Sequence, residues 1–338
     1  MTLTSAAARH LGECLICAAP LRAYFEGMFD DRFGHPGEFG IARCPECGFM
    51  STEPRFAEGD LPDLYARYYP RRRTRPENVR RAAEATAVAT RRGRFRAWLW
   101  GQRSAHHEIA AGMRVLDYGC GDCGSLLEIR ALGGEPYGVE VDPNVREIAA
   151  ALGVPVHVGT LDTLPPPDGS FDAVTFSQVI EHVPDPAALL RGAHRRLRPD
   201  GMVAITTPNS RALSRWLCGR RWLNWHIPFH QNHFDARVLR RLLEGVGFRV
   251  TKCRTFTPVP WWEYQAELLM RPASRGRAHP YFGHGESALG PYRFGRKLMR
   301  LARMAALPLA RAIDLCRLGD SLLVVARKSP GGRFERSP

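Results

Sequence analysis

The chain has 338 residues, of which 44% are hydrophobic, and this is enough to bury one large core or two modest ones. It lacks an apolar run of about 18 residues, and its first residues lack the apolar core of a signal peptide. We therefore expect a cytoplasmic protein without a membrane-spanning helix.

The formal net charge of +14 is concentrated in two segments. Residues 71–103 hold eleven arginines, and residues 271–311 hold eight arginines and one lysine. Segments of this kind suit an anionic partner such as phosphate, nucleic acid or a membrane surface, or they are solvated helix faces. The sequence leaves both interpretations open.

Two Cys-x-x-Cys pairs lie near the start of the chain: Cys14 with Cys17, and Cys44 with Cys47. In a cytosolic protein this spacing favours four thiolates around one tetrahedral zinc ion over disulfides. The alternatives are unliganded thiols or a redox pair. The pattern predicts a zinc-ribbon module over residues 1–52, followed by a basic helical linker over residues 53–110.

A strand ending in an acid and breaking into glycines occupies Val115–Gly124, with the sequence VLDYGCGDCG. A helix is expected to open at Ser125, so its free N–H groups would face a ligand held by the glycine turn. Glu140 closes the next apolar run, where a carboxylate can hold both hydroxyls of a ribose. An isolated glycine run is a weak signal, but this pairing predicts a nucleotide-binding crossover.

Strands and helices are expected to alternate through the rest of the chain, which predicts an α/β fold with a doubly wound, mostly parallel sheet. The core is assigned to residues 111–256 plus 319–328. The expected strands are 113–118, 136–141, 154–158, 171–177, 201–206, 247–253 and 320–327, and helices are expected at 143–152, 185–197 and 234–246.

A basic helical insert or lid over residues 257–318 separates the last two strands. Its helical run from Phe294 to about Arg317 is amphipathic and basic, and we expect a kink or break at Pro308. Such a helix packs on its own protein or lies on an anionic membrane.

Four stretches of the core, VLDYGCG, VEVDP, GTLDTLPPPDGSFDAVTFSQVIEHVPDP and LRPDGMVAITTPN, resemble the class I S-adenosylmethionine-dependent methyltransferases. The resemblance implies a Rossmann-like fold and S-adenosylmethionine as cofactor. The cofactor contacts that it implies are Asp117, Gly119, Gly121, Glu140, Thr160, Leu161 and Gln178. The glycine loop departs from the family's usual GxGxG, because Cys123 precedes Gly124, and Thr160 stands where the family often has Asp.

The same resemblance directs attention to histidines after the fourth and fifth strands. Glu181-His182 matches the family's EH pair, so His182 is expected near the reacting group, either as a base or as a loop anchor. In the stretch from Trp222 to Phe234, His230 and His233 are candidate bases or acceptor contacts. A metal held by the histidines of this stretch is a weaker alternative, because Pro228 argues against a regular helix there.

The ribbon, with its sequence CPECGFM, resembles those that precede methyltransferase cores acting on small molecules and sugars, and also those of certain ribosomal RNA methyltransferases. We therefore expect methyl transfer to a small-molecule, sugar or lipid-linked acceptor at oxygen, with peripheral contact to an anionic membrane as an option. The alternative is an RNA methyltransferase that grips nucleic acid with the ribbon and the basic arms. The stretch Ser177–Ile180 counts against exocyclic-amine chemistry.

Overall fold

The computed structural model describes residues 12–70, 74–283 and 295–329. The arginine run at 71–73, the first residue of the expected helix at 294–317, and residues 1–11 of the expected ribbon module lie outside the described residues.

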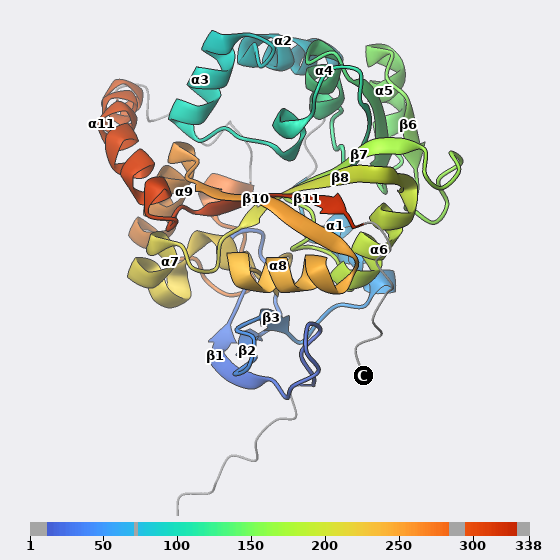
Figure 1. The fold of residues 1–338 in the computed structure, drawn as a ribbon. Coiled ribbons are helices and arrows are strands. Elements are labelled where there is room, and N and C mark those ends of the chain that lie inside the picture. Colours follow the sequence, from blue (N-terminus) through green and yellow to red (C-terminus); the bar gives the residue numbers. More distant parts are fainter. Residues whose placement is uncertain (1–11, 71–73, 284–294, 330–338) are drawn as a thin grey trace, which may run out of the picture.

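A seven-stranded sheet forms the centre of the molecule, in the order β10-β11-β8-β7-β4-β5-β6 (Figure 1). The five strands from β8 to β6 run parallel, and β11 pairs antiparallel with both β8 and β10. This arrangement confirms the predicted Rossmann-like α/β class. The strands are β4 (Arg114–Tyr118), β5 (Glu135–Glu140), β6 (Val156–Val158), β7 (Phe171–Ser177), β8 (Leu197–Pro208), β10 (Phe248–Phe256) and β11 (Ser321–Lys328).

Helices cover both faces of this sheet. Figure 1 shows α4 (Gly124–Ala131) and α5 (Val145–Leu152) on one face, and α6 (Pro186–Arg196) and α8 (Ala236–Gly245) on the other. Both α6 and α8 begin at an aspartate whose side chain accepts a backbone N–H of the first turn, a favourable N-cap. The caps fix where these two helices start relative to the preceding strands.

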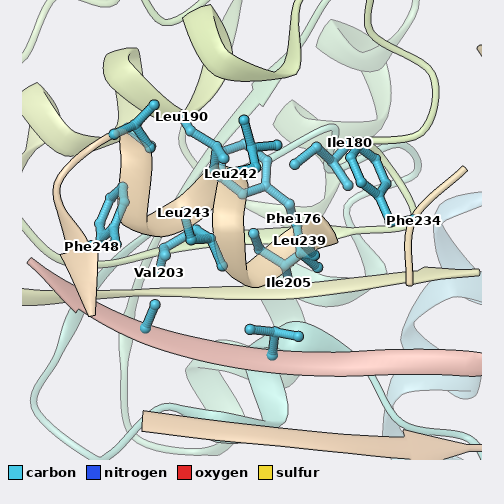
Figure 2. Packing of buried hydrophobic residues seen from close by; sticks show 14 of the residues in the cluster. Phe176, Ile180, Leu190, Val203, Ile205, Phe234, Leu239, Leu242, Leu243 and Phe248 are labelled. Carbon is cyan, nitrogen blue, oxygen red and sulfur yellow. The ribbon is translucent and has the colours of Figure 1, made fainter. Parts of the chain in front are cut away.

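Leucines at helical spacing hold α8 on the sheet. Figure 2 shows Leu239, Leu242 and Leu243 of α8 beside Phe176 of β7 and Ile205 of β8, and all five are buried. Complete burial of such a side chain contributes about 1.5–3 kcal/mol. This core lies directly beneath the strand ends that carry the candidate site.

A second sheet of four strands, in the order β1-β2-β3-β9, forms the N-terminal ribbon. Three strands come from the N-terminal region: β1 (Arg22–Met28), β2 (Phe39–Arg43) and β3 (Met50–Glu53). The fourth, β9 (Asn232–His233), comes from the core and pairs with β3. No sequence pattern predicts this shared sheet, which attaches the ribbon to the histidine-bearing segment.

Three further helices lie before the core: α1 (Leu61–Tyr68), α2 (Pro76–Thr86) and α3 (Arg91–Trp100). A short helix, α7 (Leu213–Cys218), follows β8.

The insert between β10 and β11 contains α9 (Val259–Met270), α10 (Pro280–Gly283) and α11 (Gly295–Leu315). Its helix α11 continues through Pro308, so the break expected there is wrong. Leu307 and Ala310 of α11 are buried against Val259, and Arg311 donates to the Thr257 carbonyl at 2.7 Å. In the part of α11 whose side chains are described, the helix thus packs on its own chain. None of the described helices is both long and apolar enough to cross a membrane.

Candidate active site

The glycine loop after β4 and the acid at the end of β5 lie together at the carboxyl edge of the sheet. Gly119 and Gly121 have φ angles of +75° and +53°, a region that L side chains rarely adopt. The backbone N–H of Gly121 donates to Oε2 of Glu140 at 2.9 Å. A Cβ added to Gly121 would meet no atom within 4 Å, so there is open space in front of the loop.

Asp117 is buried beneath this loop and accepts hydrogen bonds from hydroxyl groups of the same chain. Its two carboxylate oxygens accept hydrogen bonds from Ser125 Oγ and Thr175 Oγ1, each at 2.5 Å. Burial raises the pKa of Asp117 above its usual value. Because these bonds tie the start of α4 to two strands, Asp117 is placed to shape the loop rather than to face a ligand.

The remaining predicted cofactor residues lie at the same edge. The backbone N–H of Thr160 donates to Thr163 Oγ1 at 3.0 Å, and the side chain of Leu161 is buried in the core. Gln178 has a φ of +58°, and its side-chain amide lies 3.4 Å from Ser321 Oγ. Only Thr160 and Gln178 are thus partly accessible, and Leu161 can offer a ligand only its backbone.

The Glu181-His182 pair follows β7, as the sequence predicts. His182 Nδ1 lies 3.0 Å from the Phe229 carbonyl and 2.7 Å from Tyr65 Oη. A proton on Nδ1 is donated to the Phe229 carbonyl and leaves the lone pair on Nε2, whereas a donating Tyr65 hydroxyl requires the lone pair on Nδ1. Burial lowers the pKa of His182 to about 4, so the ring is neutral near pH 7.

Glu181 is buried beside this histidine. Its Oε2 accepts from Thr207 Oγ1 at 3.0 Å, whereas its Oε1 has no hydrogen-bond partner among the described residues. Burial raises the pKa of Glu181 to about 8. The carboxyl group is therefore largely protonated at neutral pH unless a cation approaches it.

His230 and His226 continue the row of imidazoles. His230 Nδ1 lies 2.9 Å from the Asn224 carbonyl, and His230 Nε2 lies 3.3 Å from His226 Nδ1. The rings of His182 and His230 are 4.6 Å apart between centroids. A carboxylate oxygen of Glu181 and one ring nitrogen each of His182 and His230 lie within 4.8 Å of one another. The structure thus brings the predicted residues His182 and His230 together with the carboxyl group of Glu181.

His233, the third predicted histidine, lies apart from this group. Its Nε2 lies 3.0 Å from Thr52 Oγ1, and its ring packs on Trp225. The residue is part of β9, so the strand pairing with the ribbon turns its side chain into the ribbon interface.

Aromatic side chains from two other segments cover the histidines. Tyr65 and Tyr69, in and directly after α1, contact Phe229 with ring centroids 5.5 and 5.2 Å apart. Phe33, from the ribbon loop between β1 and β2, lies 5.5 Å from the His226 ring. Sequence reasoning did not select Tyr65 or His226, because only tertiary contacts bring them to the EH pair.

The four ribbon cysteines form one cluster. Sγ of Cys14 lies 3.5 Å from Sγ of Cys47, Sγ of Cys17 lies 3.5 Å from Sγ of Cys44, and all four sulfurs lie within 4.8 Å. A tetrahedral site with zinc–sulfur bonds of about 2.3 Å has sulfur–sulfur edges of about 3.8 Å. Backbone N–H groups also donate to the sulfurs of Cys14 and Cys44. The cluster therefore has the donor set and size of a tetrahedral thiolate site.

The sheet topology, with a glycine loop after β4 facing an acid at the end of β5, defines a Rossmann-like α/β protein. A family profile described as a methyltransferase domain matches residues 87–252. A ubiquinone biosynthesis O-methyltransferase of Xanthomonas axonopodis pv. citri is 33% identical over 165 residues, which are 45% of this chain and 69% of that protein. The chain belongs to the S-adenosylmethionine-dependent methyltransferases.

Other similar proteins carry related names. A probable S-adenosylmethionine-dependent methyltransferase of Mycolicibacterium smegmatis is 38% identical over 152 residues, or 44% of this chain. The chain spans 56% of that relative's length. A solved S-adenosylmethionine-dependent methyltransferase from Archaeoglobus fulgidus aligns with 73% of this chain and 94% of its own, at 21% identity and a TM-score of 0.42.

The raised pKa of Glu181 gives a testable dependence of stability on pH. In the folded protein this carboxyl keeps its proton up to about pH 8, whereas the unfolded chain releases it near the ordinary value of 4.5. Its contribution to stability is therefore fully present below about pH 4.5 and is lost as the pH rises through 8. We expect Glu181→Gln to remove this loss, so that the variant gains stability relative to wild type between pH 5 and 8.

Urea unfolding midpoints at several pH values measure this difference. Glu244→Gln, on the exposed surface of α8, is the matched control. Parallel pH curves for Glu181→Gln and wild type would show that Glu181 has an ordinary pKa.

Proposed function

We propose that this methyltransferase acts at an oxygen atom of a small-molecule or lipid-linked acceptor. The observation that carries the proposal is His182, a neutral imidazole placed at the same sheet edge as the glycine loop and Glu140. Its Nε2 has a lone pair for a proton when Nδ1 donates to the Phe229 carbonyl. The Xanthomonas relatives are named as ubiquinone biosynthesis O-methyltransferases, which supports oxygen as the atom methylated and a lipid-linked molecule as one class of acceptor.

The residues at the carboxyl edge fit S-adenosylmethionine. Space in front of Gly121 admits a ligand close to the backbone, and the Glu140 carboxylate is the group that would accept hydrogen bonds from the ribose hydroxyls. The Gly121 N–H donates to Glu140 Oε2, and we propose that ribose hydroxyls take its place when the cofactor binds. Thr160 and Gln178 would line the adenosine side, with Asp117 holding the loop from below.

When bound, S-adenosylmethionine supplies a methyl group activated by its sulfonium. The chain's own task is to orient the acceptor hydroxyl, exclude water and remove one proton. His182 Nε2 would take that proton from the hydroxyl, leaving the imidazolium paired with the Phe229 carbonyl through Nδ1–H. The rings of Tyr65, Tyr69 and Phe229 would exclude water around it.

We propose that the four-cysteine cluster binds one structural zinc ion. Zinc would fix the two knuckles of the ribbon, because without metal four clustered thiols have no covalent or ionic link. We expect one zinc per purified chain by elemental analysis, loss of that zinc in Cys44→Ser, and a lower unfolding temperature on chelation. Cys218→Ser, remote from the cluster in α7, should keep its zinc. A metal-free wild type of unchanged stability would contradict the proposal.

The cofactor assignment predicts that Glu140→Ala binds S-adenosylhomocysteine at least about 10–100-fold more weakly, since it removes two charge-assisted hydrogen bonds. Isothermal titration calorimetry measures the affinity directly. Glu135→Ala is the matched control, because Glu135 lies at the opposite end of the same strand and is exposed. Equal affinity of Glu140→Ala and Glu135→Ala would refute the assignment.

The base assignment predicts that His182→Gln lowers kcat by about 10²–10⁴-fold while leaving the affinity for S-adenosylhomocysteine unchanged. Transfer of labelled methyl from S-adenosylmethionine to a panel of phenols, sugars and lipid-linked phenols measures the rate. His194→Gln, a buried histidine at the end of α6, controls for loss of an imidazole. Equal turnover in the two variants would exclude His182 as the base.

A further inference from the structure

A buried arginine lies in the ribbon loop, close to the row of imidazoles formed by His182, His230 and His226. Arg32 is 8% exposed, and its Nε and Nη2 have no hydrogen-bond partner among the described residues. These two nitrogens form one edge of the planar guanidinium, which is the edge that binds carboxylate or phosphate through two parallel hydrogen bonds. A cation enclosed in this way is costly unless an anion meets it.

The neighbouring acids do not satisfy this edge. Asp31 Oδ1 is 3.5 Å from Arg32 Nε, an ion-pair contact without hydrogen-bond geometry. Asp30 is already committed, because its two carboxylate oxygens accept the backbone N–H groups of Arg32, Phe33 and His35 at 2.9–3.0 Å. The same three bonds hold the loop in a fixed conformation, so the guanidinium is preorganised.

The guanidinium lies between the ribbon, the insert and the acceptor side of the site. Its Cζ is 5.5 Å from the centroid of Phe282, and the Arg32 carbonyl accepts the His279 N–H at 2.8 Å. The following residue, Phe33, contacts Tyr69 and His226, with ring centroids 5.1 and 5.5 Å away. Burial is the main cause of the lowered pKa values of His226 and His230, and the nearby charge of Arg32 lowers them further.

We propose that Arg32 binds an anionic group of the methyl acceptor, a carboxylate or a phosphate monoester, and so orients the acceptor hydroxyl toward the histidines. This inference rests on the proposed function, because it assigns the anion to the acceptor. Asp31 competes for the same cation, so the free energy of anion binding includes displacement of that neighbour.

The test uses the full chain saturated with S-adenosylhomocysteine and two probes that share one ring, benzoate and phenyl phosphate. Calorimetric titration should show binding of at least one probe, and the tighter probe identifies the anion as carboxylate or phosphate. Arg32→Gln should weaken that binding at least 10-fold, and Arg32→Lys should weaken it less, because lysine keeps the charge but loses the two-donor edge.

Asp31→Asn should have the opposite effect on probe binding, and this effect is not expected if Arg32 has only a structural role. Removal of the competing carboxylate should tighten binding of the probe about 2-fold or more. Arg67→Gln, which removes an exposed arginine of α1, controls for net charge and should leave binding unchanged.

Three results would overturn the proposal: no binding of either probe to wild type, equal binding by Arg32→Gln and Arg67→Gln, or a matching loss of S-adenosylhomocysteine affinity in Arg32→Gln. The last result would assign Arg32 to the cofactor's own carboxylate. Failure of the proposed function is a separate outcome, since a chain that binds no S-adenosylhomocysteine would show it before any probe is added.

Discussion

The pairing of β9 with β3 is the contact on which the rest of the site depends. Asn232 and His233 extend the ribbon sheet opposite Ser51 and Met50, and Arg55 adds hydrogen bonds to the Gln231 carbonyl and the Asn232 side chain. Backbone N–H groups of residues 231 and 232 in turn donate to the Glu181 carbonyl. One network of hydrogen bonds thus joins the ribbon, the segment from residue 231 to 233 and the Glu181-His182 pair. The ribbon is therefore part of the structure that surrounds the site.

This network explains how one edge of the sheet supports two different environments. On the β4–β5 side, glycines with positive φ and the carboxylate of Glu140 leave space and polarity for a nucleoside. On the β7 side, rings from α1 and the ribbon loop remove water, which lowers the pKa of His182 and raises that of Glu181. A neutral imidazole follows directly from that burial.

Local sequence patterns predicted the parts of the site that depend on backbone conformation or on ligand spacing. The glycine turn at 119–121, the acid Glu140 and the paired cysteines are of this kind, because each is specified within a few residues. His226 and Arg32 could not be found in this way, since distant segments determine whether their nitrogens acquire partners. The direction of the His233 side chain could not be predicted for the same reason: its two-residue strand has no propensity signal, and pairing with the ribbon decides where the side chain lies. Pro308 stays within α11, where packing of Leu307 and Ala310 outweighs the local cost of proline.

The shared sheet also sets an order of events during synthesis. Thr52 and His233, which meet across the ribbon interface, are 181 positions apart. At a translation rate of about 5–20 residues per second, roughly 10–40 s pass between synthesis of β3 and synthesis of its partner strand β9. During that interval it is an unpaired edge strand, the kind of surface that invites aggregation. Early closure of the cysteine knuckles would keep the nascent ribbon compact while its last strand is still being translated.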